Sequence, residues 1–172
     1  DPRFMGVSSL RVINEDKVRP LSGFARHSHD NMEILTCILA GEVSHEDSMG
    51  NKTTISAGEF QLMSAGSGVT HSEFNPSRTE GASLLQIWIM PRQRGLKPSY
   101  TEWHPDPTKE NEPKVLVISP DGREGSATIQ QDANIYRVRL TPGQSVTHEN
   151  AKGRGTWFQL IKGSIEVEGT RL

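Results

Sequence analysis

The chain has 172 residues, which is enough for one large domain or two small ones with a buried core. Its 19 Lys and Arg nearly balance 21 Asp and Glu, which argues against a protein devoted to nucleic acid or another polyanion. No apolar run approaches the roughly 18 residues that a membrane-spanning helix needs, and a single cysteine excludes an internal disulfide. We therefore expect a soluble, cytoplasmic protein with no direct nucleic-acid or membrane partner.

The two ends of the chain predict a longer parent protein. The first residue is Asp1 rather than methionine, and no segment resembles a signal peptide. The last residue, Leu172, comes directly after an expected strand, with no closing element behind it. We expect truncation at both ends.

Short β-prone runs separated by turn residues extend along the chain. Sixteen glycines and ten prolines are spread through it, as in repeated tight turns. The runs expected to form strands are residues 32–40, 42–45, 52–55, 60–64, 82–90, 115–119, 135–140, 156–161 and 164–168. No stretch of ten or more residues has helical periodicity. This spacing predicts an all-β sandwich or barrel.

A change in composition separates two halves. Residues 91–113 hold several prolines and charges with few apolar side chains, which is typical of an inter-domain connection. We place the boundary near residue 108, with domains at 1–107 and 108–172. A faint repeat relates the halves, since CILAGEV at 37–43 matches QLIKGSI at 159–165, each predicted as strand, glycine turn and strand. The repeat predicts a duplicated β-barrel, with the second copy truncated.

Histidines are the candidate chemical groups. His27 and His29 are two residues apart, as are His71 and Glu73, and in a strand such pairs project from one face. Three neutral ring nitrogens and one carboxylate suit a divalent first-row metal. The alternative is that His71 is a buried structural residue and that Glu73 pairs with Arg78.

The other histidines receive no role. His45 lies in a polar stretch expected to face solvent, His104 lies in the connection, and His148 is expected on the surface of the second half. A lone His148 cannot assemble three or four metal ligands there. Cys37 alternates with leucines and is expected to be buried, and Trp88 is expected to line the barrel core.

Several segments resemble known family motifs. Residues 23–41, G-x3-H-x-H-x3-E-x7-G, resemble the first cupin motif, and residues 58–75, G-x5-S-x-G-x4-H-x3-N, resemble the second. Ser64 stands where a proline is usual, and the loop before His71 is longer than usual. The stretches HSHDNMEILTCILAGEVSHEDSMGN, AGEFQLMSAGSGVTHSEFNPS and LLQIWIMP are similar to bacterial members of the pirin family, as are DPRFMGVSSLRVIN and SPDGREGSATIQQDANIY. The resemblance covers essentially the whole chain.

The resemblance implies a bicupin, with two jelly-roll-like β-barrels of which the first holds one metal ion and the second is degenerate. The implied ligands are His27, His29, His71 and Glu73. Glu33 matches the carboxylate that many other cupins use, and we favour Glu73 over it. The implied cofactor is one divalent transition metal ion per chain, iron first, with copper, nickel, manganese and zinc as alternatives.

The implied activity is that of a quercetin 2,3-dioxygenase, which cleaves a flavonol with dioxygen and releases carbon monoxide. In this reaction Glu73 is the expected catalytic base for the proton of the flavonol 3-hydroxyl. The alternative is a non-enzymatic regulator, a redox-sensing transcriptional or metabolic cofactor that binds a protein partner. A third possibility is an unrelated small substrate, because a fold does not fix a function.

Overall fold

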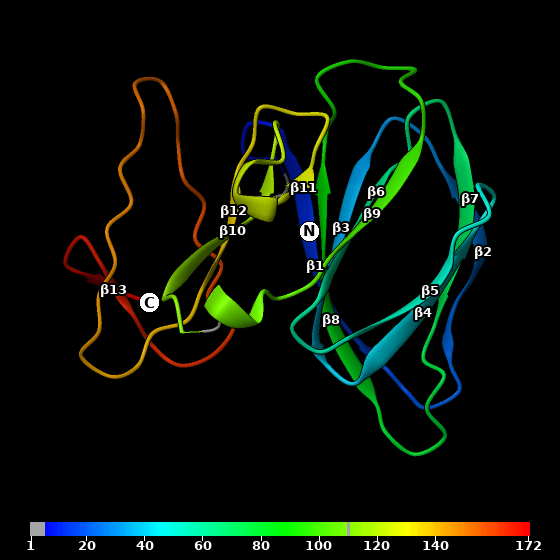
Figure 1. Cartoon of the computed structure of the whole chain (residues 1–172), viewed down its shortest axis with the longest axis horizontal. Coiled ribbons are helices and arrows are strands. Elements are labelled where there is room, and N and C mark those ends of the chain that lie inside the picture. Colours follow the sequence, from blue (N-terminus) through cyan, green and yellow to red (C-terminus); the bar gives the residue numbers. More distant parts are fainter. Residues whose placement is uncertain (1–5, 110) are drawn as a thin grey trace.

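The computed structural model describes residues 6–109 and 111–172 (Figure 1). Strands dominate it, which confirms the all-β expectation. The first half contains β1 Leu10–Val18, β2 Gly23–His29, β3 Glu33–Ala40, β4 Glu42–Asp47, β5 Lys52–Ser56, β6 Phe60–Ser64, β7 Val69–Phe74, β8 Ala82–Ile89 and β9 Ser99–Trp103. The second half contains β10 Lys114–Ser119, β11 Ala127–Thr128, β12 Ile135–Val138, β13 Glu166–Val167 and β14 Thr170–Arg171. The described ranges also contain two short 3-10 turns, η2 Pro107–Lys109 and η3 Arg123–Gly125. No helix in these ranges is long and apolar enough to cross a membrane.

The first nine strands form two sheets that face each other. One sheet has the order β1-β8-β3-β6-β9, and the other has the order β2-β7-β4-β5. Figure 1 shows them as the two walls of one barrel. Apolar side chains from both walls fill its interior in two buried clusters, one around Ile38, Ile55 and Leu84 and the other around Ile34 and Met63. These clusters are the core that holds the site-bearing strands in place.

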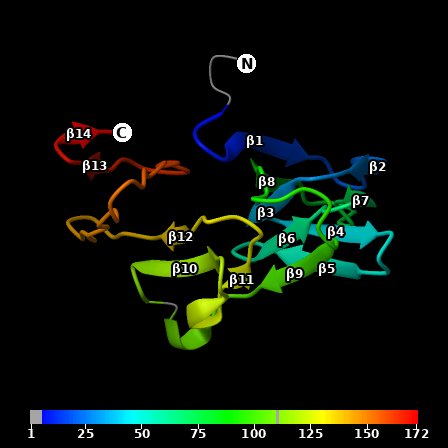
Figure 2. The same cartoon turned by 90° about the horizontal axis from the view of Figure 1, so that it is seen from above.

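The five-stranded sheet is also covered on its other face. Along β3, Leu35 and Cys37 point away from the barrel interior and pack with Trp103 of β9 and with Val117 and other buried residues of the second half. Because alternate residues of a strand point to opposite faces, a strand covered on both faces is buried along its length, and the run Glu33–Ile38 is wholly buried, including the polar Glu33 and Thr36. Figure 2 shows β10, β11 and β12 beside β9, on the side of the barrel away from β2.

Two strand expectations need correction. The connection expected at residues 91–113 contains strand β9, which pairs with β6 at the edge of the sheet. An edge strand needs apolar side chains on only one face, and on that face Trp103 packs edge-on against Phe60. Residues 156–161 do not form the expected strand within the described part of the chain, and Trp157 and Phe158 are exposed there. A strand needs a neighbour to pair its backbone groups, and no described strand pairs with residues 156–161. The boundary near residue 108 stays a prediction.

The loop between β6 and β7 is shaped by glycine, as the sequence indicates. Gly66 and Gly68 have φ values of +49° and +138°, which disfavour any residue with a side chain. A Cβ at Gly66 would lie 2.1 Å from the carbonyl oxygen of Leu96. The bend therefore lets the chain pass close to its neighbour and enter β7 two residues before His71.

Candidate metal centre

The register between β2 and β7 brings the two expected pairs of side chains together. Phe24 lies opposite Glu73, whereas His27 lies opposite His71, so β2 contains one extra residue in a bulge between these positions. In an uninterrupted ladder Arg26 would face His71, and His27 and His29 would point to the other face. The bulge shifts the side-chain alternation by one residue and places the histidines of β2 on the face that carries His71.

Three imidazoles converge at this point. The ligand nitrogens of His27, His29 and His71 all lie within 4.8 Å of one another. Their ring centroids are 4.5 to 5.0 Å apart. His71 is buried, His29 is half-buried and His27 is exposed, so the cluster runs from the barrel interior to a rim open to solvent.

The chemistry of these rings fits a cation. The Nδ1–H of His27 donates to the carbonyl oxygen of Ala25 at 2.7 Å, which leaves Nε2 with a bare lone pair. That Nε2 faces the Nε2 of His71 at 3.1 Å. Burial and the neighbouring His27 and His45 lower the pKa of His71 to about 3, so this ring is neutral at physiological pH. Neutral nitrogens directed at one point are the donors that divalent transition metals take.

Glu73 lies beside this cluster. It belongs with His45 and His71 to a second group of possible ligand atoms, all buried and within 4.8 Å of one another, so the two groups share His71. One carboxylate oxygen of Glu73 accepts hydrogen bonds from Gln61 and Thr36, and the other accepts one from Gln86 at 2.9 Å. Burial raises the pKa of Glu73, and the neighbouring His45, Thr36, Gln86 and His27 oppose the shift.

The expectation that His45 faces solvent is wrong. Its exposed fraction is 1%, and it lies on the inner face of β4, opposite Glu73. In the sequence, the short polar run around His45 looks like a solvent-exposed strand. The polar groups that His45 faces inside the barrel belong to another strand, so the run itself does not reveal them. One signal was available, since His45 and Asp47 repeat the two-residue spacing of the other two pairs. Burial alone would raise the pKa of Asp47, but hydrogen bonds from Asn51 and His45 outweigh it and lower that pKa.

The side chain of Glu33 lies on the opposite face of β3, away from the histidine cluster. Its carboxylate accepts hydrogen bonds from the Ser64 hydroxyl at 2.7 Å and the backbone N–H of Gln130 at 3.1 Å. It joins neither group of candidate ligands among the described residues. Burial raises its pKa, and those two hydrogen bonds oppose the shift. Because alternate residues of β3 point to opposite faces of the sheet, the side chain of Glu33 faces the second half of the chain.

The other residues singled out in the sequence lie outside the ligand groups and have contacts of their own. Trp88 is half-buried, packs edge-on against His29 at 5.1 Å between ring centroids, and donates its Nε1–H to Gln86, so it borders the histidine cluster. His104 pairs with carboxylates at the surface, and His148 is exposed. Glu73 accepts hydrogen bonds from amide and hydroxyl groups rather than pairing with Arg78 among the described residues.

Two facing sheets with histidines converging from adjacent strands define a cupin-type barrel. The family model described as Pirin matches residues 2–89, and that described as Quercetinase C-terminal cupin domain matches residues 116–172. This chain belongs to the pirin family.

Relatives of known name or structure agree with this assignment. Quercetin 2,3-dioxygenase of Escherichia coli strain K12 is 48% identical over 171 residues, which are 99% of this chain and 73% of the relative. The pirin-like protein of Caulobacter vibrioides is 35% identical over 100% of this chain and 74% of its own. The crystal structure of YhhW from Escherichia coli matches with a TM-score of 0.78 at 53% identity, over 81% of this chain and 58% of that one. Bacterial pirin YhhW in complex with nickel(II) matches with a TM-score of 0.76 at 51% identity, over 81% and 59% of the two chains. This chain therefore spans less than two thirds of the YhhW crystal chains.

Proposed function

We propose that this protein is a metal-dependent dioxygenase that cleaves a flavonol such as quercetin and releases carbon monoxide. The observation that carries the proposal is the convergence of three histidine nitrogens within 4.8 Å at the end of a barrel, with a buried glutamate adjoining them. The names of curated relatives and the family model of the second half support the substrate class.

The ligands in this proposal are His27, His29, His71 and Glu73. The three rings supply neutral nitrogens, and Glu73 supplies a carboxylate from the next inward position of β7. Glu73 becomes a ligand when one of its oxygens exchanges an amide or hydroxyl donor for the ion. Iron is the metal we propose, and the nickel complex of YhhW makes nickel the first alternative to test.

Residues of this chain accept the substrate proton and shape the route by which the substrate reaches the metal. When bound, the metal supplies a Lewis acid for the ionised 3-hydroxyl of the flavonol and a partner for dioxygen. Glu73 accepts the hydroxyl proton in this proposal, because its carboxylate adjoins the histidine cluster and burial favours its protonated form. The exposed side of His27 gives the planar substrate a route in, and the Trp88 ring beside His29 offers it a surface to pack on.

The test combines metal analysis with turnover. Protein purified without a metal-affinity tag is stripped, reloaded with iron, nickel, copper, manganese or zinc, and assayed for loss of quercetin absorbance under oxygen, with carbon monoxide measured in the headspace. The proposal expects oxygen-dependent turnover with at least one metal and none in the stripped protein. If no metal supports turnover, the enzymatic proposal is overturned in favour of the regulatory alternative, and binding of a protein partner to the oxidised and reduced forms becomes the next measurement.

A further inference from the structure

We infer that His45 and Asp47 are positioning residues that fix the ring tautomer of His71 and so direct its Nε2 lone pair toward the metal. The inference rests on the proposed metal site and extends it inward, to two residues outside the ligand set. It follows from the order of donors and acceptors along one line of buried side chains, from Asp47 through His45 to His71.

Asp47 is fixed as a hydrogen-bond acceptor. Its Oδ1 accepts the backbone N–H groups of Met49 at 2.8 Å and Asn51 at 3.1 Å, and its Oδ2 accepts the side-chain amide of Asn51 at 2.8 Å. The same Oδ2 lies 3.1 Å from Nε2 of His45. A carboxyl group that receives three N–H donors is held in its ionised form, which only accepts. The Nε2 of His45 therefore carries a proton and donates it to Asp47.

This bond determines the tautomer of His45 and, through it, that of His71. With the proton that faces Asp47 on Nε2, the Nδ1 of His45 is the ring nitrogen left to accept a hydrogen bond. It lies 3.4 Å from Nδ1 of His71. The Nδ1 of His71 is consequently the donor, and its Nε2 presents a lone pair toward His27.

Burial, ring stacking and strand register together hold the side chain of His45 in place. Its side chain and that of Asp47 are 0% exposed. The ring of Tyr100 stacks on His45 at 4.5 Å between centroids and an angle of 21°. In the β4–β7 ladder Asp47 lies directly opposite His71, so the sheet register itself aligns the relay. Metal-bound histidines usually donate their other ring N–H to an outer partner that fixes their orientation, and here that partner is a histidine backed by a carboxylate.

Two substitutions separate the two hydrogen bonds of His45. His45→Asn places an amide oxygen near the position of Nδ1 and keeps an acceptor for His71. His45→Gln places its amide near the position of Nε2 and keeps the donor to Asp47 while removing the acceptor for His71. Asp47 itself is left intact because it also holds the turn through Met49 and Asn51.

The first readout needs no metal. Nitrogen-15 NMR of the ring nitrogens of His71 in the stripped protein is expected to show the Nδ1–H tautomer in the parent and in His45→Asn. His45→Gln is expected to shift the ring toward the Nε2–H tautomer. If His71 keeps the same tautomer in folded His45→Gln, the relay is overturned.

The second readout is the affinity for nickel(II), measured by competition with a chelator. Loss of an outer partner of a metal-bound histidine typically weakens binding about 10- to 100-fold, and we expect a loss of this size in His45→Gln and an affinity near that of the parent in His45→Asn. Equal affinity in all three proteins would contradict the inference. A parent that binds no nickel or iron would instead overturn the proposed site, and the NMR result would still decide whether the relay exists.

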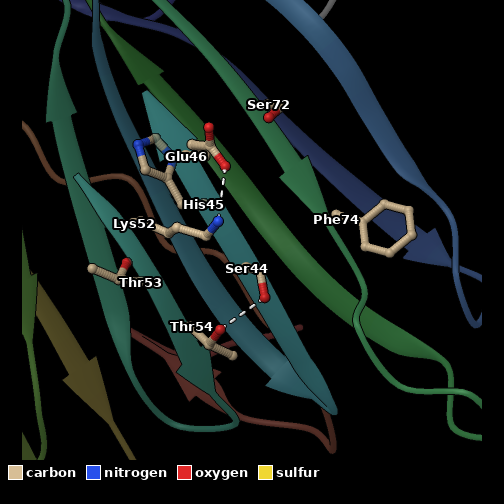
Figure 3. Close-up of a pocket in the computed structure, with 8 residues that line it drawn as sticks. All are labelled: Ser44, His45, Glu46, Lys52, Thr53, Thr54, Ser72 and Phe74. Carbon is tan, nitrogen blue, oxygen red and sulfur yellow. Dashed lines mark hydrogen bonds and ion pairs between the residues drawn. The ribbon is translucent and has the colours of Figure 1, made fainter. Parts of the chain in front are cut away.

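Glu46→Gln is the matched control. Glu46 lies between the two relay residues on β4 but points outward, where it pairs with Lys52 at 3.5 Å and with Arg26 at 3.7 Å. Figure 3 shows the Glu46–Lys52 pair in a hollow on the outer face of the four-stranded sheet. Both the His71 tautomer and the nickel affinity should stay unchanged in this variant. Thermal unfolding of all variants confirms that they are compared in the folded state.

Discussion

Replacement of Glu73 by glutamine tests the assigned base most directly. The carboxylate serves three donors, with Gln61 and Thr36 on one oxygen and Gln86 on the other. An amide has only one acceptor oxygen, so its NH2 group would face the donating amide of Gln86. Gln86 cannot simply turn round, because its own oxygen accepts the Nε1–H of Trp88 at 2.9 Å.

The expected magnitudes follow from this count. One hydrogen bond to a charged group is lost, which costs about 1.5–3 kcal/mol of folding stability, and relief of the buried charge offsets part of that cost. Loss of a general base lowers turnover about 10²–10⁴-fold, equivalent to roughly 2.7–5.5 kcal/mol in the barrier. Glu73→Gln should therefore remain folded and retain much of its metal, yet lose most of its activity.

The assay compares quercetin turnover per bound metal with stability to urea. Glu33→Gln is the matched control, because Glu33 is equally buried but bonds to Ser64 and Gln130 on the other face of β3. This control should lose stability while keeping its turnover and metal content. If Glu73→Gln turns over quercetin as fast as the parent at equal metal content, Glu73 is not the base. If Glu33→Gln loses the metal, the ligand assignment is wrong.

Three further results are expected. Metal analysis should give one ion per chain, unchanged by His148→Ala, because His148 is the sole histidine after residue 114; two ions per chain, one of them lost in that variant, would refute this. Leu84→Ala should lower the free energy of unfolding by about 2–5 kcal/mol, since Leu84 is 0% exposed between the two sheets; a loss well under 1 kcal/mol in urea unfolding would contradict that packing. Hydrogen bonds to Glu59 and Glu102, opposed by slight burial, raise the pKa of His104, so its contribution to stability is present below about pH 6.5 and is lost as the pH rises through the raised value. A parent and His104→Gln whose stabilities differ by the same amount at pH 5.5 and pH 9 would exclude that linkage.

Local sequence pattern determined most of the strands and the residues that share a face, but it missed β9 and placed a strand at residues 156–161 that the structure lacks. The two-residue spacings His27–His29 and His71–Glu73 make each pair project from one side of its strand, whatever the strand pairs with. The glycines before His71 indicate the bend, and the motif resemblance indicates the barrel and the family. These properties depend on neighbours along the chain and on family pattern, so they were predictable from the sequence.

Tertiary structure decided how the pairs meet and which other residues join them. The bulge in β2 shifts its alternation by one residue and brings His27 opposite His71, and no local spacing specifies such a register. The inward position of His45 depends on which face of β4 the barrel closes over, and the outward position of Glu33 depends on the same choice for β3. A polar residue is hidden or exposed according to what packs against its face, and that packing partner is remote in the sequence.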